Sequence, residues 1–367
     1  MARRRLGLVA CLSLVLASAC VRQPRSVVST EPIASDDGWA LATPAERGLD
    51  PGALAAITKE LVSREFDHKL DAFLIVREGS LVYELHLHGA ELGDLYDLRS
   101  VTKSITSLLV GIAVERGELE LETPVWSTLG RELPAEDRRA EIHVEDLLTM
   151  SSGLDCDDRR FDSPGQEDRM YRRRDWLAFF LDLPLVEGPV TPHYCTAGVV
   201  ALGAMLERHS GVAIPEYAAS HLFGPLGIED VIWAHYDRKR GTDTGGHLQM
   251  RARDLAKLGQ VVLDQGRWAE REIVSPSWIE ASTGARVELD DQGYGYLWWL
   301  EQLPGPGGES VSIVYAAGNG GQLLLIAPEL ELVVVATGRA YNSRAAGVAY
   351  AMIQALLVRG FVDDDEG

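Results

Sequence analysis

The segments that favour β-strands lie near both ends of this chain, and this placement constrains the fold more than any other feature. Two of them, residues 72–76 and 81–88, flank the turn residues Glu78-Gly79-Ser80 and predict a β-hairpin. Three further strands are predicted near the C-terminus, at residues 311–315, 322–326 and 330–336. Because the intervening region is poor in strand signals, one antiparallel sheet is expected to be assembled from both ends of the chain.

The remaining segments have the periodicity and end signals of helices joined by loops. Asp50 is suited to cap a helix that begins at Pro51. Further helices are predicted over residues 100–116, 176–183, 197–208, 253–263 and 343–357. The chain is therefore predicted to be of the α/β class. An antiparallel sheet flanked by helices would come from about 39–117 and 290–357, and an all-α part from about 118–289. A functional site is expected in the cleft between the two parts.

The first residues have the features of an export signal. Residues 1–19 combine three arginines with the apolar stretch 6–16, which is too short to span a bilayer, and end in Ala17-Ser18-Ala19. Cys20 follows directly, an arrangement that resembles the lipobox of bacterial lipoproteins, in which the cysteine is lipidated and becomes the mature N-terminus. We expect a signal peptide over 1–19, with lipidation at Cys20 or simple secretion as alternatives, and a polar tether over 20–38.

The composition excludes several classes of function. With 35 Lys and Arg against 55 Asp and Glu, the formal net charge is −20, which removal of three arginines with residues 1–19 would take to −23. Nucleic acids and anionic membrane surfaces both require basic protein surfaces, so neither is an expected partner. A lipid anchor at the N-terminus would be the single membrane attachment. Residues 358–367 are expected to form an acidic tail.

Ser100 and Lys103 form an S-x-x-K motif at the start of a predicted helix. Residues three apart share a helix face, so the lysine amine can reach the serine oxygen. The chain has only 5 lysines beside 30 arginines, which makes a chance occurrence of the motif less expected. The helix N-terminus and the apolar residues that follow are expected to lower the pKa of Lys103 toward that of a working base.

This motif and its surroundings resemble the serine β-lactamase and penicillin-binding-protein superfamily. The nearest likeness is to the class C β-lactamase-related esterases and amidases, including the 6-aminohexanoate-dimer hydrolases, and it covers about residues 39–357. The stretches that carry it are 97–104, 147–154, 251–256, 294–299 and 318–322. The resemblance implies a β-lactamase/transpeptidase-like fold and a nucleophilic Ser100.

The superfamily's other motifs are matched in part. Its Y-x-N motif falls at Tyr194-Cys195-Thr196, so Tyr194 is implied to be the phenol that takes and returns protons. Thr196 replaces the asparagine in the substrate-binding position and keeps one hydrogen-bonding oxygen. The third motif, K-T-G or H-x-G, is replaced by Ala316-Ala317-Gly318, which has no cationic or imidazole side chain.

The resemblance also implies an oxyanion hole made by the backbone amides of Ser100 and Asn319. Gly318, Gly320 and Gly321 would let the backbone come close to the substrate, although a tight strand connection would need the same glycines. No metal or other cofactor is expected.

The implied reaction is acyl transfer in two steps. Ser100 would attack an ester or amide carbonyl, with its proton taken by the Lys103/Tyr194 pair, and water would then hydrolyse the acyl-enzyme. Which of the two residues is the formal base stays open at this point. The expected partner is a small amide or ester substrate.

Two other functions compete with an exported amide or ester hydrolase. A D-alanyl-D-alanine peptidase or β-lactamase is the first, and the missing cation at Ala316 argues against it. A catalytically idle lipoprotein that binds cell-wall peptides or a protein partner is the second. The joint presence of Ser100, Lys103 and Tyr194 argues against that alternative.

The cysteines predict one disulfide. Cys11 lies within the signal and Cys20 at its end, which leaves Cys156 and Cys195. Both follow segments expected at the cleft, and an exported protein enters a compartment that permits disulfides. We therefore predict a Cys156–Cys195 disulfide.

Overall fold

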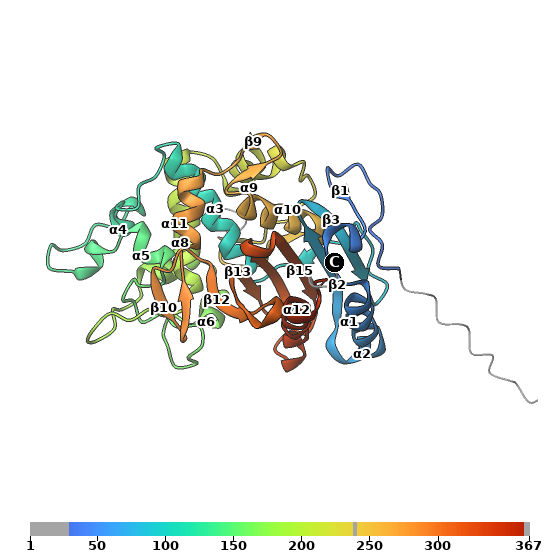
Figure 1. The fold of residues 1–367 in the computed structure, drawn as a ribbon. Helices are drawn as coiled ribbons and strands as arrows, with labels where there is room; N and C mark the ends of the chain where they lie inside the picture. The colour runs from blue at the N-terminus through green and yellow to red at the C-terminus, as the bar shows by residue number, and fades with distance from the viewer. Residues whose placement is uncertain (1–28, 238–240, 363–367) are drawn as a thin grey trace, which may run out of the picture.

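The computed structural model describes residues 29–237 and 241–362 (Figure 1). The predicted signal peptide, Cys20 and the end of the acidic tail lie outside the described residues. Within the described ranges, no helix is long and apolar enough to cross a membrane.

A nine-stranded sheet built from both ends of the chain forms the centre of the fold. Its strands follow the order β1-β3-β2-β15-β14-β13-β12-β11-β10, and every neighbouring pair is antiparallel except β1 and β3. The bounds are β1 (Ala40–Leu41), β2 (Leu70–Arg77), β3 (Ser80–His86), β10 (Val287–Leu289), β11 (Gln292–Tyr294), β12 (Trp299–Pro304), β13 (Ser310–Gly318), β14 (Gln322–Ala327) and β15 (Leu332–Gly338). The predicted antiparallel sheet is therefore confirmed, with β2 from the N-terminal group paired to β15 from the C-terminal group.

The hairpin and the three C-terminal strands were predicted close to where they lie, whereas β10, β11 and β12 were not predicted. Glu78 and Gly79 both have positive φ, the conformation of the tight turn that joins β2 to β3. The strands β10 and β11 have three residues each, too few for an alternating pattern to stand out. The strand β12 carries Glu301 and Gln302 and ends in Pro304, which weakens its strand signal.

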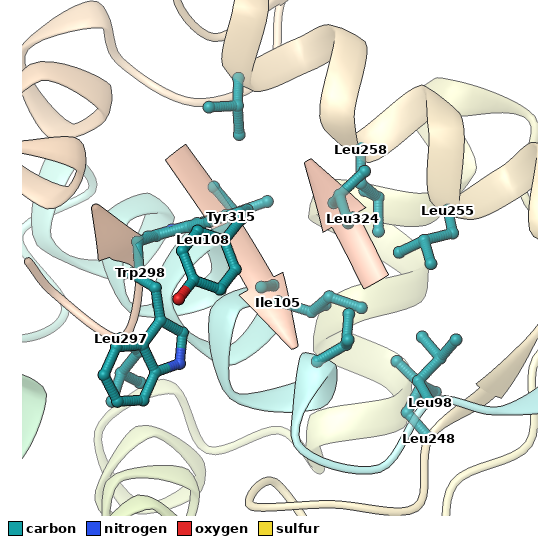
Figure 2. Packing of buried hydrophobic residues seen from close by; sticks show 14 of the residues in the cluster. Leu98, Ile105, Leu108, Leu248, Leu255, Leu258, Leu297, Trp298, Tyr315 and Leu324 are labelled. Atoms are coloured by element: carbon teal, nitrogen blue, oxygen red, sulfur yellow. The ribbon is translucent and has the colours of Figure 1, made fainter. Parts of the chain in front are cut away.

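Helices cover both faces of the sheet. The helices α1 (Pro51–Ser63) and α12 (Val348–Arg359) lie on one face, and α3 (Val101–Glu115) and α10 (Ala252–Leu263) on the other (Figure 1). Figure 2 shows Ile105 and Leu108 of α3 and Leu255 and Leu258 of α10 packed around Leu324 of β14. Burial of such side chains, worth ~25 cal/mol per Å² of apolar surface, holds α3 in place beneath the sheet.

A second group of helices lies beside the sheet and forms the helical part of the molecule (Figure 1). It contains α4 (Val125–Thr128), α5 (Val144–Leu148), α6 (Glu167–Tyr171), α7 (Trp176–Leu181), α8 (Thr196–Ser210), α9 (Ile214–Ala218) and α11 (Pro276–Thr283). The helix α10 falls within the range 118–289 but packs on β14 and β15 of the sheet. The fold also continues past residue 357, because α12 runs to Arg359 and Phe361 bridges to Leu49.

Candidate active site

Ser100 lies directly before the first turn of α3, in the N-cap position. A serine in this position commonly accepts a hydrogen bond from a backbone N–H of the first turn, but the Ser100 side chain makes no such bond. Its Oγ instead accepts a hydrogen bond from Lys103 Nζ at 3.1 Å. The contact expected from the i, i+3 spacing is therefore present, and the Ser100 oxygen is left partly exposed at the helix end.

The residue before Ser100 adopts an unusual backbone conformation. Arg99 has φ +50°, in the left-handed region that few non-glycine residues occupy. Its backbone N–H donates to Asp97 Oδ1 at 3.1 Å, and its guanidinium contacts Asp97 and His247. Conformations of this kind are typical of functional sites, where the surroundings hold them in place.

Lys103 is buried, with 1% of its surface exposed. Its Nζ donates a hydrogen bond to the Gly245 carbonyl at 2.6 Å, in addition to the bond to Ser100, and lies 5.0 Å from the centre of the Tyr194 ring. The loop that presents Gly245 is held by buried Asp243, whose Oδ1 accepts hydrogen bonds from the backbone N–H groups of Gly245 and Gly246. Lys103 is thus fixed between Ser100, Tyr194 and this loop.

The predicted lowering of the Lys103 pKa is wrong. Burial alone would lower it, but Tyr194 and the carboxylates of Glu167, Asp158 and Asp243 oppose that effect and raise the pKa above its usual value. The sequence-based expectation rested on the apolar helix that carries Lys103. It did not include three acidic side chains that other loops and helices bring to the same place.

Tyr194 immediately precedes α8 and is held by aromatic and cationic neighbours. Its ring stacks on Trp299 of β12, with the ring centres 5.8 Å apart and the planes at 19°. The guanidinium of Arg159 lies over both rings, 5.6 Å from the centre of Tyr194 and 5.4 Å from that of Trp299. The phenol is therefore positioned beside Lys103 by residues from two other parts of the chain.

Thr196 occupies a different setting from the substrate-binding role implied by the resemblance. It is fully buried, and its hydroxyl donates to Asp158 Oδ2 at 2.6 Å. Its backbone N–H donates to the same oxygen at 2.7 Å, and the hydroxyl lies 3.3 Å from Glu167 Oε2. The hydroxyl is thus directed at two acidic side chains of the protein itself.

The end of β13 lies against the segment that precedes Ser100. A Cβ atom at Gly318 would come within 2.4 Å of the Leu98 carbonyl oxygen, so only glycine permits this approach. Gly320 has φ +103°, and a Cβ there would lie 2.7 Å from the Tyr341 ring. These glycines allow protein segments to pack closely, and they bring the backbone of Asn319 toward the start of α3. The Asn319 side chain itself is hydrogen-bonded to Asn342.

Cys156 and Cys195 form the predicted disulfide, with their Cα atoms 5.3 Å apart and a sequence separation of 39 residues. The bond joins the loop after α5 to the residue that follows Tyr194. In the folded protein the bond therefore restrains the segment that carries the Tyr194 phenol. In the denatured chain it restricts the conformations available to the polypeptide.

Loss of this disulfide is expected to lower the stability of the protein by about 3–4 kcal/mol, on the chain-entropy estimate for a loop of this length. In a Cys156→Ser/Cys195→Ser double variant, the midpoint of thermal unfolding should fall by roughly 5–10 °C. A reductant should lower the midpoint of the parent protein and leave that of the double variant unchanged. Maleimide labelling of two free thiols in the unreduced parent would contradict the prediction.

Asp158, Glu167 and Asp243 were not identified from the sequence. One signal was present: a Cys156–Cys195 bond brings residues 158 and 196 close together, and threonine stands at position 196 in place of asparagine. The carboxylate and the hydroxyl at these positions form the 2.6 Å hydrogen bond seen in the structure. No comparable signal in the chain pointed to Asp243.

Comparison with known proteins identifies the family. The sequence profile of the beta-lactamase family matches residues 62–357, most of the chain. The chain belongs to the beta-lactamase family. Its β-lactamase/transpeptidase-like fold, expected from the motifs, is confirmed by this match and by the sheet described above.

Relatives in the beta-lactamase family include an amide hydrolase and an esterase. The chain is 26% identical over 318 residues to 6-aminohexanoate-dimer hydrolase of Paenarthrobacter ureafaciens, an alignment that covers 80% of this chain and 79% of that enzyme. It is 28% identical over 211 residues to esterase EstB of Burkholderia gladioli, covering 50% of this chain and 54% of that protein.

A solved structure shares the fold. The class C beta-lactamase of Rhodobacter sphaeroides superposes with a TM-score of 0.63 at 18% identity, covering 84% of this chain and all of that one. With its family and its amidase and esterase homologues established, the chain is a hydrolase of the beta-lactamase family.

Proposed function

We propose that this chain is an exported serine hydrolase that cleaves small amides or esters through an acyl-enzyme on Ser100. The observation that carries the proposal is the hydrogen bond of 3.1 Å between buried Lys103 Nζ and Ser100 Oγ, with the Tyr194 ring beside the same ammonium. A serine oxygen bonded to a lysine, with a tyrosine beside that lysine, supplies the parts needed for nucleophilic catalysis.

In the first step, Ser100 Oγ attacks the substrate carbonyl and its proton passes to the Lys103/Tyr194 pair. The carbonyl oxygen becomes an oxyanion, which the backbone N–H groups of Ser100 and Asn319 stabilise. The tetrahedral intermediate collapses, and the leaving amine or alcohol receives the proton through Tyr194. Water then attacks the Ser100 ester, which releases the carboxylic acid and restores the serine hydroxyl.

The surroundings of Lys103 favour Tyr194 as the group that accepts the proton. A lysine whose pKa is raised by Tyr194 and by nearby carboxylates holds its own proton at neutral pH. In that state Lys103 supplies a positive charge beside the phenolate form of Tyr194 and a hydrogen bond to Ser100 Oγ. The pair then works as a phenolate base with an ammonium counter-charge.

The substrate class is proposed from the relatives and from β13. An aminohexanoate-dimer hydrolase and an esterase among the relatives support an acyl donor with a small amide or ester. Ala316, which stands where the lactamase motif has a cation, is buried at 1% exposure. This supports a substrate other than a β-lactam. Export, with lipidation at Cys20 or simple cleavage before it, is proposed from the first twenty residues.

Two covalent probes test this function. The soluble form, lacking residues 1–20, should be labelled by a fluorophosphonate and not by a fluorescent penicillin, and Ser100→Ala should abolish the label. Absence of labelling by either probe would contradict the enzyme proposal. Labelling by both would favour a penicillin-recognising enzyme instead.

A further inference from the structure

We propose that Asp158 is a positioning residue for this reaction, which fixes the backbone at Tyr194 and, with Glu167 beside it, controls the charge held by the Lys103/Tyr194 pair. The inference rests on the function proposed above and extends it to residues outside the three catalytic motifs.

Hydrogen bonds of Asp158 hold the chain at Tyr194 and at Thr196, two residues later. Its backbone N–H donates to the Tyr194 carbonyl at 2.8 Å, and its Oδ2 accepts from the N–H and the hydroxyl of Thr196 at 2.7 and 2.6 Å. The Cys156–Cys195 disulfide joins the same two segments. Tyr194 is therefore enclosed by a covalent link and three hydrogen bonds, two of which end on the Asp158 carboxyl.

The second oxygen of the Asp158 carboxyl group, Oδ1, takes part in none of these hydrogen bonds. Asp158 Oδ1 is buried and has no hydrogen-bond partner among the described residues. Burial of an oxygen without a hydrogen-bond partner costs much more free energy for a charged carboxylate than for a protonated carboxyl group. The geometry alone therefore favours retention of a proton by Asp158.

A second acid strengthens this preference. Glu167 of α6 is linked to Asp158 through the Thr196 hydroxyl, which lies 3.3 Å from Glu167 Oε2 and 2.6 Å from Asp158 Oδ2. Burial, and then the charge of Glu167, raise the pKa of Asp158 to about 7, although Lys103 and the Thr196 hydrogen bonds act in the opposite direction. Asp158 therefore retains a proton up to near neutral pH.

The groups that face this pair come from several elements. Lys103 lies on α3, Tyr171 is on α6 with Glu167, Tyr194 precedes α8, and Asp243 lies beyond Lys103 on the loop of Gly245. Arg159, next to Asp158 in sequence, lies over the Tyr194 ring and pairs with Asp290. Lys103 is the buried cation among the groups named here, so the Asp158 charge acts chiefly on it and on the phenol beside it.

The charge of Asp158 affects the first chemical step. Transfer of the Ser100 proton to the Lys103/Tyr194 pair makes that pair more positive by one charge. A carboxylate at Asp158 stabilises this change, and a neutral carboxyl does not. The value of kcat/KM should therefore rise as pH increases through about 7, where Asp158 loses its proton.

The effect on stability has the opposite direction. Because the folded pKa of Asp158 lies above the ordinary aspartate value, the folded protein binds a proton that the unfolded chain releases between about pH 4 and pH 7. Stability is thus lost as pH rises across this interval. Asp158→Asn removes the ionisation and should raise the unfolding midpoint above pH 7 relative to the parent.

The test compares Asp158→Asn with Asp162→Asn, which makes the same chemical change in the same loop at an exposed residue paired with Arg160. kcat/KM for p-nitrophenyl acetate is measured from pH 5 to 9, together with thermal unfolding. The parent and Asp162→Asn should show a rising limb with an apparent pKa near 7. Asp158→Asn should lack this limb and be about 10- to 100-fold slower at pH 8, without a loss of stability.

A second variant tests whether the charge of Glu167 influences the titration of Asp158. Glu167→Gln removes the neighbouring charge, so the limb should move to lower pH and remain present. An Asp158→Asn protein that keeps the limb, or one that is slower only because it is less stable, would overturn the proposal. If the parent shows no Ser100-dependent turnover, the proposed function fails, while the comparison of unfolding midpoints above and below pH 7 still tests the proton held by Asp158.

Discussion

Replacement of Lys103 by methionine is expected to lower kcat/KM by about three orders of magnitude or more, because the change removes the hydrogen bond to Ser100 Oγ and the charge beside Tyr194. It also leaves the carboxylates of Asp158, Glu167 and Asp243 without their buried cation. Loss of one partner from a buried charge cluster costs about 3–5 kcal/mol, so the variant should unfold at lower temperature at neutral pH. Steady-state kinetics and thermal unfolding measure the two effects.

A second buried lysine provides the control for this experiment. Lys257 of α10 is also 1% exposed, donates to the Leu226 carbonyl at 3.1 Å and pairs with Asp254 at 3.3 Å. Lys257→Met should lower stability and leave the kcat/KM of the folded protein near that of the parent. Equal losses of activity in the two variants would show that the effect of Lys103 is structural only.

Replacement of Tyr194 by phenylalanine is expected to lower kcat by about 10²- to 10⁴-fold, with a much smaller change in KM. The ring would still stack on Trp299 and contact Lys103 and Arg159, so the fold should be retained. The missing hydroxyl removes proton transfer to and from Ser100 and the leaving group, and such steps contribute factors of this size.

Tyr315→Phe is the matched control for the phenol. Tyr315 also stacks against Trp299, with the ring centres 6.3 Å apart, but its hydroxyl donates to Gln292 Oε1 at 2.8 Å. This variant should keep kcat within a few-fold of the parent. A Tyr194→Phe protein with full activity would exclude the phenol as the proton carrier and leave Lys103 as the base.

Features encoded within a single segment were predictable from the sequence. The hairpin β2–β3 has a turn with its own residue signals, and the strands β13 to β15 are continuous apolar stretches. The contact of Ser100 with Lys103 follows from helix geometry alone, because both residues belong to one turn. The disulfide followed from export and from the small number of cysteines available.

Features that depend on distant segments could not be predicted in this way. The pKa of Lys103 is raised by acids at positions 158, 167 and 243, which reach it from two loops and a short helix. Thr196 turns its hydroxyl inward because Asp158 is there to accept the hydrogen bond. Electrostatic effects of this kind depend on distances across the fold, which no local pattern contains.

The pairing of β2 with β15 also determines when the protein can fold. The strand pair that connects the two groups of strands joins residues 70–77 to residues 332–338, so the sheet cannot be completed until residues 332–338 have been synthesised. A chain that emerges from the ribosome in sequence order cannot complete this core early, and contacts so distant in sequence form slowly. Under the export proposed above this delay would be useful, because a polypeptide that stays unfolded during synthesis can be threaded through a narrow membrane channel. The same topology affects a chain that is terminated prematurely. Such a chain lacks β15, so the edge of β2 would be exposed and the chain would be open to degradation.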